Sequence, residues 1–136
     1  MRIGGKGSVV DNAHAGGCFV GIYEDGSFGH EVFDQYGRHR TVFNNIDFTA
    51  DYKYPNWNNV IKFAKSVGKY IPHHRLIALD IVLDKESNPL LIEFNIVGYS
   101  TWFFQYTVGP AFGRYTNEIL DYCKQHKGEM EYLIHI

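Results

Sequence analysis

Apolar and polar residues alternate through the middle of the chain, and this pattern predicts two antiparallel strands. The first strand is expected over Arg75–Asp84 and the second over Pro89–Asn95, with a turn centred on Glu86-Ser87. One face of this hairpin would be polar and the other dry, as in a sheet packed on one side. The dry face would carry only apolar side chains: Leu79, Ile81, Leu83, Leu90, Ile92 and Phe94.

The register of the hairpin depends on the length of its turn. A loop of two or four residues would pair Asp84 with Pro89, whereas three or five residues would shift every later pair by one position. Glu86-Ser87 lacks the glycine that tight two-residue turns prefer. We therefore expect a four-residue loop over Lys85–Asn88.

In that register two acidic side chains face each other on the polar side. Asp80 would lie directly opposite Glu93, and Asn95 would share their face. Like charges at roughly 5 Å in opposed positions are destabilising. Two carboxylates and an amide oxygen that converge indicate a hard divalent cation, most simply Mg²⁺ carrying phosphate. The alternative is a hairpin with two solvated acids on its exposed side.

The N-terminal third is expected to be rich in strands. Residues 2–17 contain many glycines and one short apolar pair, Val9-Val10, which predicts loops around a short strand. Cys18–Glu24 and Ser27–Asp34 flank Asp25-Gly26, a dipeptide favoured in hairpin turns. Residues 35–54 have no steady period, which predicts an extended or irregular connection.

Two helices are predicted, one on each side of the acidic hairpin. The first helix is expected over residues 55–72, because Pro55-Asn56 marks a helix start and Pro72 ends it. The second helix is expected over residues 114–126. Residues 96–110 between them are expected to form an aromatic-rich loop. The apolar stripes would be Trp57, Val60, Ile61, Ala64, Val67 and Ile71 on the first helix, and Tyr115, Ile119, Tyr122 and Cys123 on the second. This order predicts an α+β fold, an antiparallel sheet packed on one side by two helices.

Composition narrows the classes of function. The chain has 136 residues and a net charge of −2, so neither nucleic acid nor an anionic membrane is an expected partner. No apolar run reaches the length of a membrane span. The chain has two cysteines, Cys18 and Cys123, and this low number favours reduced thiols in a cytoplasmic protein.

Two motifs are excluded as binding sites. Gly4–Ser8 lacks the spacing of a phosphate-binding P-loop. The adjacent His73-His74 would point to opposite faces of an extended segment, which disfavours a histidine metal site.

The acidic hairpin resembles the C-terminal half of an ATP-grasp domain. In that superfamily an acidic residue on one strand and a Glu-x-Asn on its neighbour bind the Mg²⁺ ions on ATP. Asp80, Glu93-Phe94-Asn95 and the following Gly98 match this pattern. The resemblance implies that Asp80, Glu93 and Asn95 bind Mg²⁺ and ATP.

A longer resemblance covers nearly the whole chain. Residues 2–12, Gly16-Gly17 and residues 112–118 are similar to the ATP-grasp subfamily associated with sugar transfer and polysaccharide clusters. The resemblance implies that residues 1–136 are the metal- and ATP-binding half of the domain. It also implies that the N-terminal subdomain, which brings phosphate-contacting lysines, is absent from this chain and is a missing partner of it.

The resemblance further implies ligase chemistry. ATP would phosphorylate a small carboxylate substrate, and a nucleophile, usually an amine, would displace the phosphate. Some of these ligases carry an arginine two residues before the strand acid, but here that position is Ala78. Arg2 is therefore the expected catalytic arginine on the transferring phosphate, and Asp11 and Asn12 would shape the substrate site.

The sequence thus favours an ATP- and Mg²⁺-dependent carboxylate–amine ligase, in polysaccharide or cell-envelope synthesis by family association. A non-catalytic binding module that keeps the half-domain fold is the alternative. A metal-dependent hydrolase is weaker, because no general base stands out near the acids. A missing half-domain would leave apolar surface exposed and favour self-association into a homo-oligomer.

Overall fold

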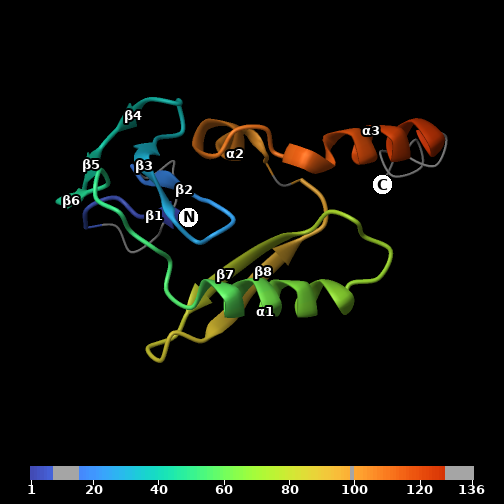
Figure 1. Ribbon diagram of the computed structural model, residues 1–136, viewed down its shortest axis with the longest axis horizontal. Coiled ribbons are helices and arrows are strands. Elements are labelled where there is room, and N and C mark those ends of the chain that lie inside the picture. Colours follow the sequence, from blue (N-terminus) through green and yellow to red (C-terminus); the bar gives the residue numbers. More distant parts are fainter. Residues whose placement is uncertain (8–15, 99, 128–136) are drawn as a thin grey trace.

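The computed structural model describes residues 1–7, 16–98 and 100–127, and it confirms the α+β class. Figure 1 shows helices α2 and α3 on one side of the molecule, with α1 and the hairpin β7–β8 on the other. The strands are β1 (Arg2–Ile3), β2 (Cys18–Ile22), β3 (Phe28–Phe33), β4 (His39–Arg40), β5 (Val42–Phe43), β6 (Ile46–Asp47), β7 (Ala78–Leu83) and β8 (Pro89–Asn95). The helices are α1 (Trp57–Lys69), α2 (Trp102–Thr107), a 3₁₀ turn η2 (Gly113–Tyr115) and α3 (Thr116–Gln125).

The strands form separate antiparallel sheets rather than one predicted sheet. β1–β4 make a four-stranded sheet in sequence order, and β5–β6 and β7–β8 are two-stranded. Val20 lies opposite Val32 in the larger sheet, and both are fully buried. With Cys18 and Phe48 they form the core of the molecule.

The predicted aromatic loop contains a helix, α2, which covers the other face of the four-stranded sheet. Phe103 stacks on Phe19 with ring centroids 5.0 Å apart, and Trp102 meets the same ring edge-on at 5.6 Å. Tyr106 stacks on Phe33 one strand further. These aromatic side chains therefore pack the helix onto the sheet, a favourable use of large apolar area.

Residues 35–54 follow the extended alternative of the prediction: β4 joins the main sheet, and β5–β6 form a tight hairpin. Asn44 and Asn45 make its turn with φ of 52° and 64°, a conformation that asparagine tolerates. On α3, the predicted inner residue Tyr115 is 52% exposed and precedes the helix.

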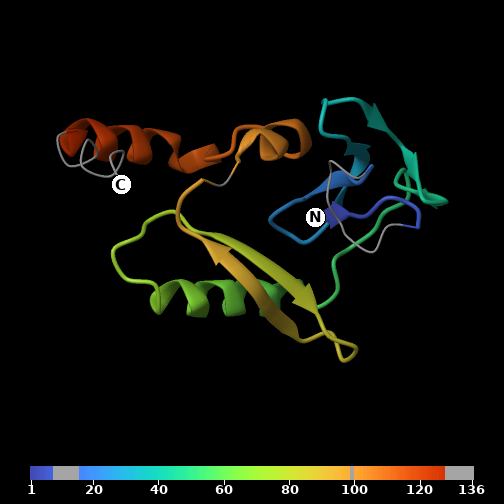
Figure 2. The same cartoon turned by 180° about the vertical axis from the view of Figure 1, so that it is seen from behind.

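The predicted stripe is confirmed on α1, where five of its residues are buried or half-buried, and Ile71, which follows the end of the helix, is half-buried as well. The start of α1 contacts the turns of two hairpins. Asn56 donates its side-chain amide to Ser87 O at 2.9 Å, and Trp57 Nε1 donates to Glu24 O at 3.0 Å. These bonds place α1 along the hairpin β7–β8, as the reverse view in Figure 2 shows.

The three hairpins β2–β3, β3–β4 and β7–β8 use one turn design. In each, the first residue donates its N–H to the carbonyl of the fifth, and the fourth donates to the carbonyl of the first. The fourth residue has a positive φ, as in a type I turn closed by a glycine bulge. The turns are Tyr23–Ser27, Asp34–Arg38 and Asp84–Asn88, with Gly26, Gly37 and Ser87 in fourth place.

This turn makes the predicted pairing at the tip of β7–β8 wrong. Leu83, not Asp84, pairs with Pro89, because the loop spans Asp84–Asn88. A bulge then adds one unpaired residue on β8, Ile92, and shifts the register back. Asp80 therefore lies opposite Glu93 as predicted, although two irregularities that cancel bring it there.

The same shift corrects the predicted dry face. Leu90 lies opposite Val82 and so shares a face with Asp80. Leu90, Ile92 and Phe94 are 49%, 67% and 48% exposed among the described residues. The dry face of the hairpin is therefore limited mainly to β7 and Leu91.

No helix in the described part of the chain is both long and apolar enough to cross a membrane.

Ser87→Gly should stabilise the protein. Ser87 holds φ at 64° in the position where the other two turns have glycine, and a non-glycine residue in the left-handed region costs roughly 1–2 kcal/mol, partly offset by the greater entropy of unfolded glycine. We expect the free energy of unfolding, measured in urea, to rise by about 0.5–1 kcal/mol. Ser87→Ala is the control and should show no such gain. A loss of stability in the glycine variant would contradict this account of the turn.

Candidate metal and phosphate site

The candidate site lies on the polar face of the hairpin. Asp80 and Glu93 are directly opposed across β7 and β8, and Asn95 follows two positions after Glu93 on the same face. The opposed carboxylates are a like-charge pair, which is unfavourable in directly opposed positions of a sheet. The structure thus brings together all three predicted metal ligands.

Arg2 also reaches this site, from a different sheet. Its Nη2 donates a 2.8 Å hydrogen bond to Asp80 Oδ2, and the two side chains are 44% and 31% exposed. β1 carries Arg2 into the four-stranded sheet by pairing it with Phe19. The ion pair therefore joins that sheet to the hairpin, with an expected contribution of about 0.2–1 kcal/mol at this exposure.

Asn95 orients Glu93. Its Nδ2 donates to Glu93 Oε1 at 3.3 Å, which leaves the amide oxygen as the atom of Asn95 suited to bind a cation. One oxygen of Asp80 meets Arg2 and one oxygen of Glu93 meets Asn95. The side chains are held through one oxygen each, so the second oxygen of each carboxylate can face a ligand.

The charges of the cluster sum to −1, from two carboxylates and one guanidinium. Within residues 1–7, 16–98 and 100–127, no three His, Cys, Asp or Glu side chains gather closely enough to form a metal centre on their own. The donor set is instead two carboxylates and an amide oxygen. This set fits Mg²⁺, which binds few protein oxygens and takes its other ligands from water and phosphate.

The predicted roles of Arg2, Asp11 and Asn12 are not tested by the structure. Arg2 was expected near the phosphates, and the structure places it against Asp80. Its contact with transferring phosphate stays a prediction. Asp11 and Asn12, expected at the substrate site, lie outside the described residues, as does the short strand expected at Val9-Val10. Sequence reasoning missed the Arg2–Asp80 ion pair, because nothing local to either residue signals the other.

A known protein family matches most of the chain. A family model described as sugar-transfer associated ATP-grasp matches residues 1–119, which include all four residues of the cluster. The chain therefore belongs to the ATP-grasp proteins, an ATP-binding and ligase-like class. Within that class it is a member of the sugar-transfer associated family. No curated protein and no solved structure matches the chain.

Proposed function

We propose that Asp80, Glu93 and Asn95 hold Mg²⁺ on ATP, and that the protein serves an ATP-dependent carboxylate–amine ligase. The observation that carries this proposal is the Asp80–Glu93 pair itself. Two acids opposed in a sheet and only partly neutralised by Arg2 are a cost to the apo fold. A divalent cation at this point would convert that cost into binding energy.

Each residue of the cluster has a role on this proposal. Asp80 and Glu93 bind the cation, while Asn95 fixes the orientation of Glu93 and offers its amide oxygen. Arg2 limits the repulsion in the apo protein and offers positive charge beside the phosphates. Magnesium-bound ATP supplies the phosphoryl group that activates a small carboxylate substrate. Asp11 and Asn12 are proposed to contact that substrate.

We further propose that turnover requires a lysine-bearing N-terminal ATP-grasp subdomain as a partner of residues 1–136. Positive charge around the triphosphate is needed to position it and stabilise its transfer. We also propose that the activity is cytoplasmic and belongs to polysaccharide or cell-envelope synthesis; the family description supports an association with sugar transfer. Self-association is also proposed, because β8 exposes three large apolar side chains.

Calorimetric titration with Mg²⁺-ATP tests the proposed site. The chain alone should bind weakly and release no ADP, and a longer chain that includes the lysine-bearing subdomain should bind more tightly. Asp80→Ala combined with Glu93→Ala should abolish binding by both, whereas Lys85→Gln in the neighbouring turn should change neither. Micromolar binding that survives the double substitution would rule out the assigned residues.

One observation favours the second candidate, a non-catalytic binding module. Arg2 already donates to Asp80, so a guanidinium could serve as the permanent counter-charge of the acids. In that case calorimetric titration with Mg²⁺-ATP would show no binding, either by residues 1–136 or by the longer chain. Arg2→Gln would then lower stability without altering any nucleotide binding.

A further inference from the structure

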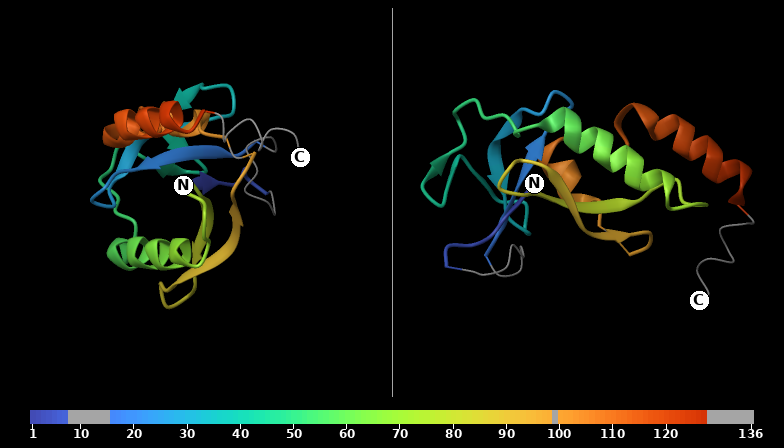
Figure 3. Two further views of the ribbon diagram at one scale, coloured as in Figure 1. Left: turned by 90° about the vertical axis from the view of Figure 1, so that its right-hand side faces the viewer. Right: turned by 90° about the horizontal axis from the view of Figure 1, so that it is seen from below.

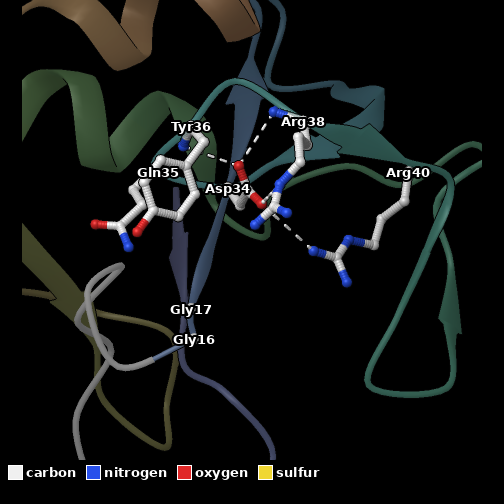
Figure 4. Close-up of a pocket in the computed structure, with 7 residues that line it drawn as sticks. All are labelled: Gly16, Gly17, Asp34, Gln35, Tyr36, Arg38 and Arg40. Carbon is white, nitrogen blue, oxygen red and sulfur yellow. Dashed lines mark hydrogen bonds and ion pairs between the residues drawn. The ribbon is translucent and has the colours of Figure 1, made fainter.

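A second polar site lies at the turn between β3 and β4. We call it the turn cavity. It has a volume of about 140 Å³ and is lined in part by Asp34, Arg38, Arg40 and the glycines Gly16 and Gly17. Figure 4 shows both guanidinium groups directed toward the Asp34 carboxylate. The glycines contribute no side chains, so the wall they form leaves space for a ligand.

The turn cavity is separate from the Asp80–Glu93 cluster, which includes Arg2. Arg2, Phe19 and Phe33 lie opposite one another along the four-stranded sheet and so share one face. Asp34 follows Phe33 and lies on the other side. Arg40 lies opposite Val32, a core residue, which also places it on that second face. The right-hand view in Figure 3 shows the four-stranded sheet toward one end of the molecule and α3 at the other.

Asp34 is built into the turn as a buried carboxylate, only 7% exposed. Its Oδ1 accepts the backbone N–H groups of Tyr36 at 2.9 Å and Arg38 at 3.1 Å. Its Oδ2 accepts Arg38 Nε at 2.8 Å and lies 3.9 Å from Arg40 Nη2. Burial would raise the pKa of Asp34, but the hydrogen bonds from Tyr36 and Arg38 outweigh it and lower this pKa below its usual value.

Asp34 therefore acts as a positioning residue for the two arginines. It holds Arg38 through Nε, and the same guanidinium lies over the Tyr36 ring, with Cζ 5.0 Å from the ring centroid. Two cations and one anion give the turn cavity a net charge of +1 in a chain of net charge −2.

The matching turn in β7–β8 shows what the turn alone requires. Asp84 Oδ1 accepts the N–H groups of Glu86 at 3.0 Å and Asn88 at 2.7 Å, as Asp34 does in its own turn. The fifth residue there is Asn88, whose neutral amide donates to Asp84 Oδ2 at 3.2 Å. An asparagine therefore suffices to close this turn. The charge of Arg38, and the second cation at Arg40, exceed that structural need.

From this excess of charge we propose that the turn cavity binds an oxyanion group, phosphate or carboxylate, at a site distinct from the nucleotide. Arginine presents paired N–H donors that match both groups, and fixing Nε in advance reduces the entropy lost on binding. The proposal does not depend on the ligase assignment, because the Asp80–Glu93 cluster lies on the other side of the sheet.

Titration with inorganic phosphate, followed by the ¹⁵N–¹H signals of Arg38 Nε and the Gly16 and Gly17 amides, tests the turn cavity. The wild-type chain should show saturable shifts at these groups. Arg38→Asn keeps the turn chemistry that Asn88 already provides, and it should weaken phosphate binding by about tenfold or more. Arg40→Gln should weaken it to a similar degree.

Lys85→Gln is the control, because it removes one positive charge from the matching turn. It should leave phosphate affinity unchanged, and equal losses in Lys85→Gln and Arg38→Asn would reduce the effect to non-specific attraction and overturn the proposal. Absence of saturable shifts with both phosphate and acetate would overturn it as well. Stronger binding of one than the other would identify the oxyanion. The Asp80→Ala/Glu93→Ala variant should still bind phosphate here, which separates this test from that of the ATP site.

Discussion

Glu93→Gln should stabilise the metal-free protein and at the same time weaken Mg²⁺-ATP binding by about 10- to 100-fold. Glutamine removes one of two opposed negative charges but keeps an oxygen that can accept the Asn95 amide. It also leaves the Arg2–Asp80 ion pair in place. Relief of the repulsion should raise the free energy of unfolding by about 0.5 kcal/mol in the absence of metal.

The experiment is informative because the same substitution should raise the free energy of unfolding and lower the affinity for Mg²⁺-ATP. Glu86→Gln makes the same chemical change in the turn of the same hairpin and is the matched control. It should alter neither the urea midpoint nor the calorimetric affinity appreciably. If Glu93→Gln destabilised the metal-free protein, the two acids would not be a source of strain, and the main physical reason for placing a cation between them would be lost.

Gly21→Ala should destabilise the fold by roughly 2–3 kcal/mol. Gly21 lies in β2 where the end of α2 crosses the sheet. A methyl group built there would come within 2.5 Å of Thr107 O and 2.7 Å of Val108 Cγ1. The first of these is a backbone atom and cannot turn aside. Thermal unfolding monitored by circular dichroism should therefore show a large fall in the melting temperature.

Gly29→Ala on the adjacent strand is the control for that substitution. A methyl group at Gly29 would meet nothing closer than 3.8 Å, and alanine in a strand is favoured over glycine by about 0.5–1 kcal/mol. The control should therefore be neutral or stabilising. Equal behaviour of the two variants would mean that α2 does not press on β2 as closely as described.

The sequence predicted best the element in which apolar residues repeat at a regular spacing. The apolar stripe of α1 repeats at helical spacing, and its five residues within the helix are buried or half-buried. That pattern survives because burial of one face acts on every residue of the helix at once. The alternation in β8 did not survive, because a bulge at Ile92 interrupts it, and Asp80 lies opposite Glu93 through two shifts that cancel.

Local turn chemistry was harder to predict. The sequence at Asp84–Asn88 has serine where a glycine would signal the five-residue turn, and the compensating bulge at Ile92 has no sequence signature. The pair Asn44-Asn45 did carry a usable signal for the β5–β6 turn, since both residues tolerate positive φ. α2 was missed because its aromatic residues are weak helix formers, and packing on Phe19 decides their conformation.

Contacts between distant segments were beyond sequence reasoning. The Arg2–Asp80 bond joins residues 78 positions apart, and the turn cavity combines Gly16 and Gly17 with a turn on the next strand. Arg2 was nevertheless proposed for the site from family resemblance, which supplied information that periodicity could not.

Paramagnetic broadening by Mn²⁺ is the most direct test of the central claim that Asp80, Glu93 and Asn95 form one cation site. Mn²⁺ prefers the same oxygen ligands and octahedral geometry as Mg²⁺. The account predicts that substoichiometric Mn²⁺ broadens the NMR signals of these three residues and of Arg2 first, that excess Mg²⁺ reverses the effect, and that Asp34–Arg38 are spared. Broadening centred elsewhere, or none at the hairpin, would contradict it.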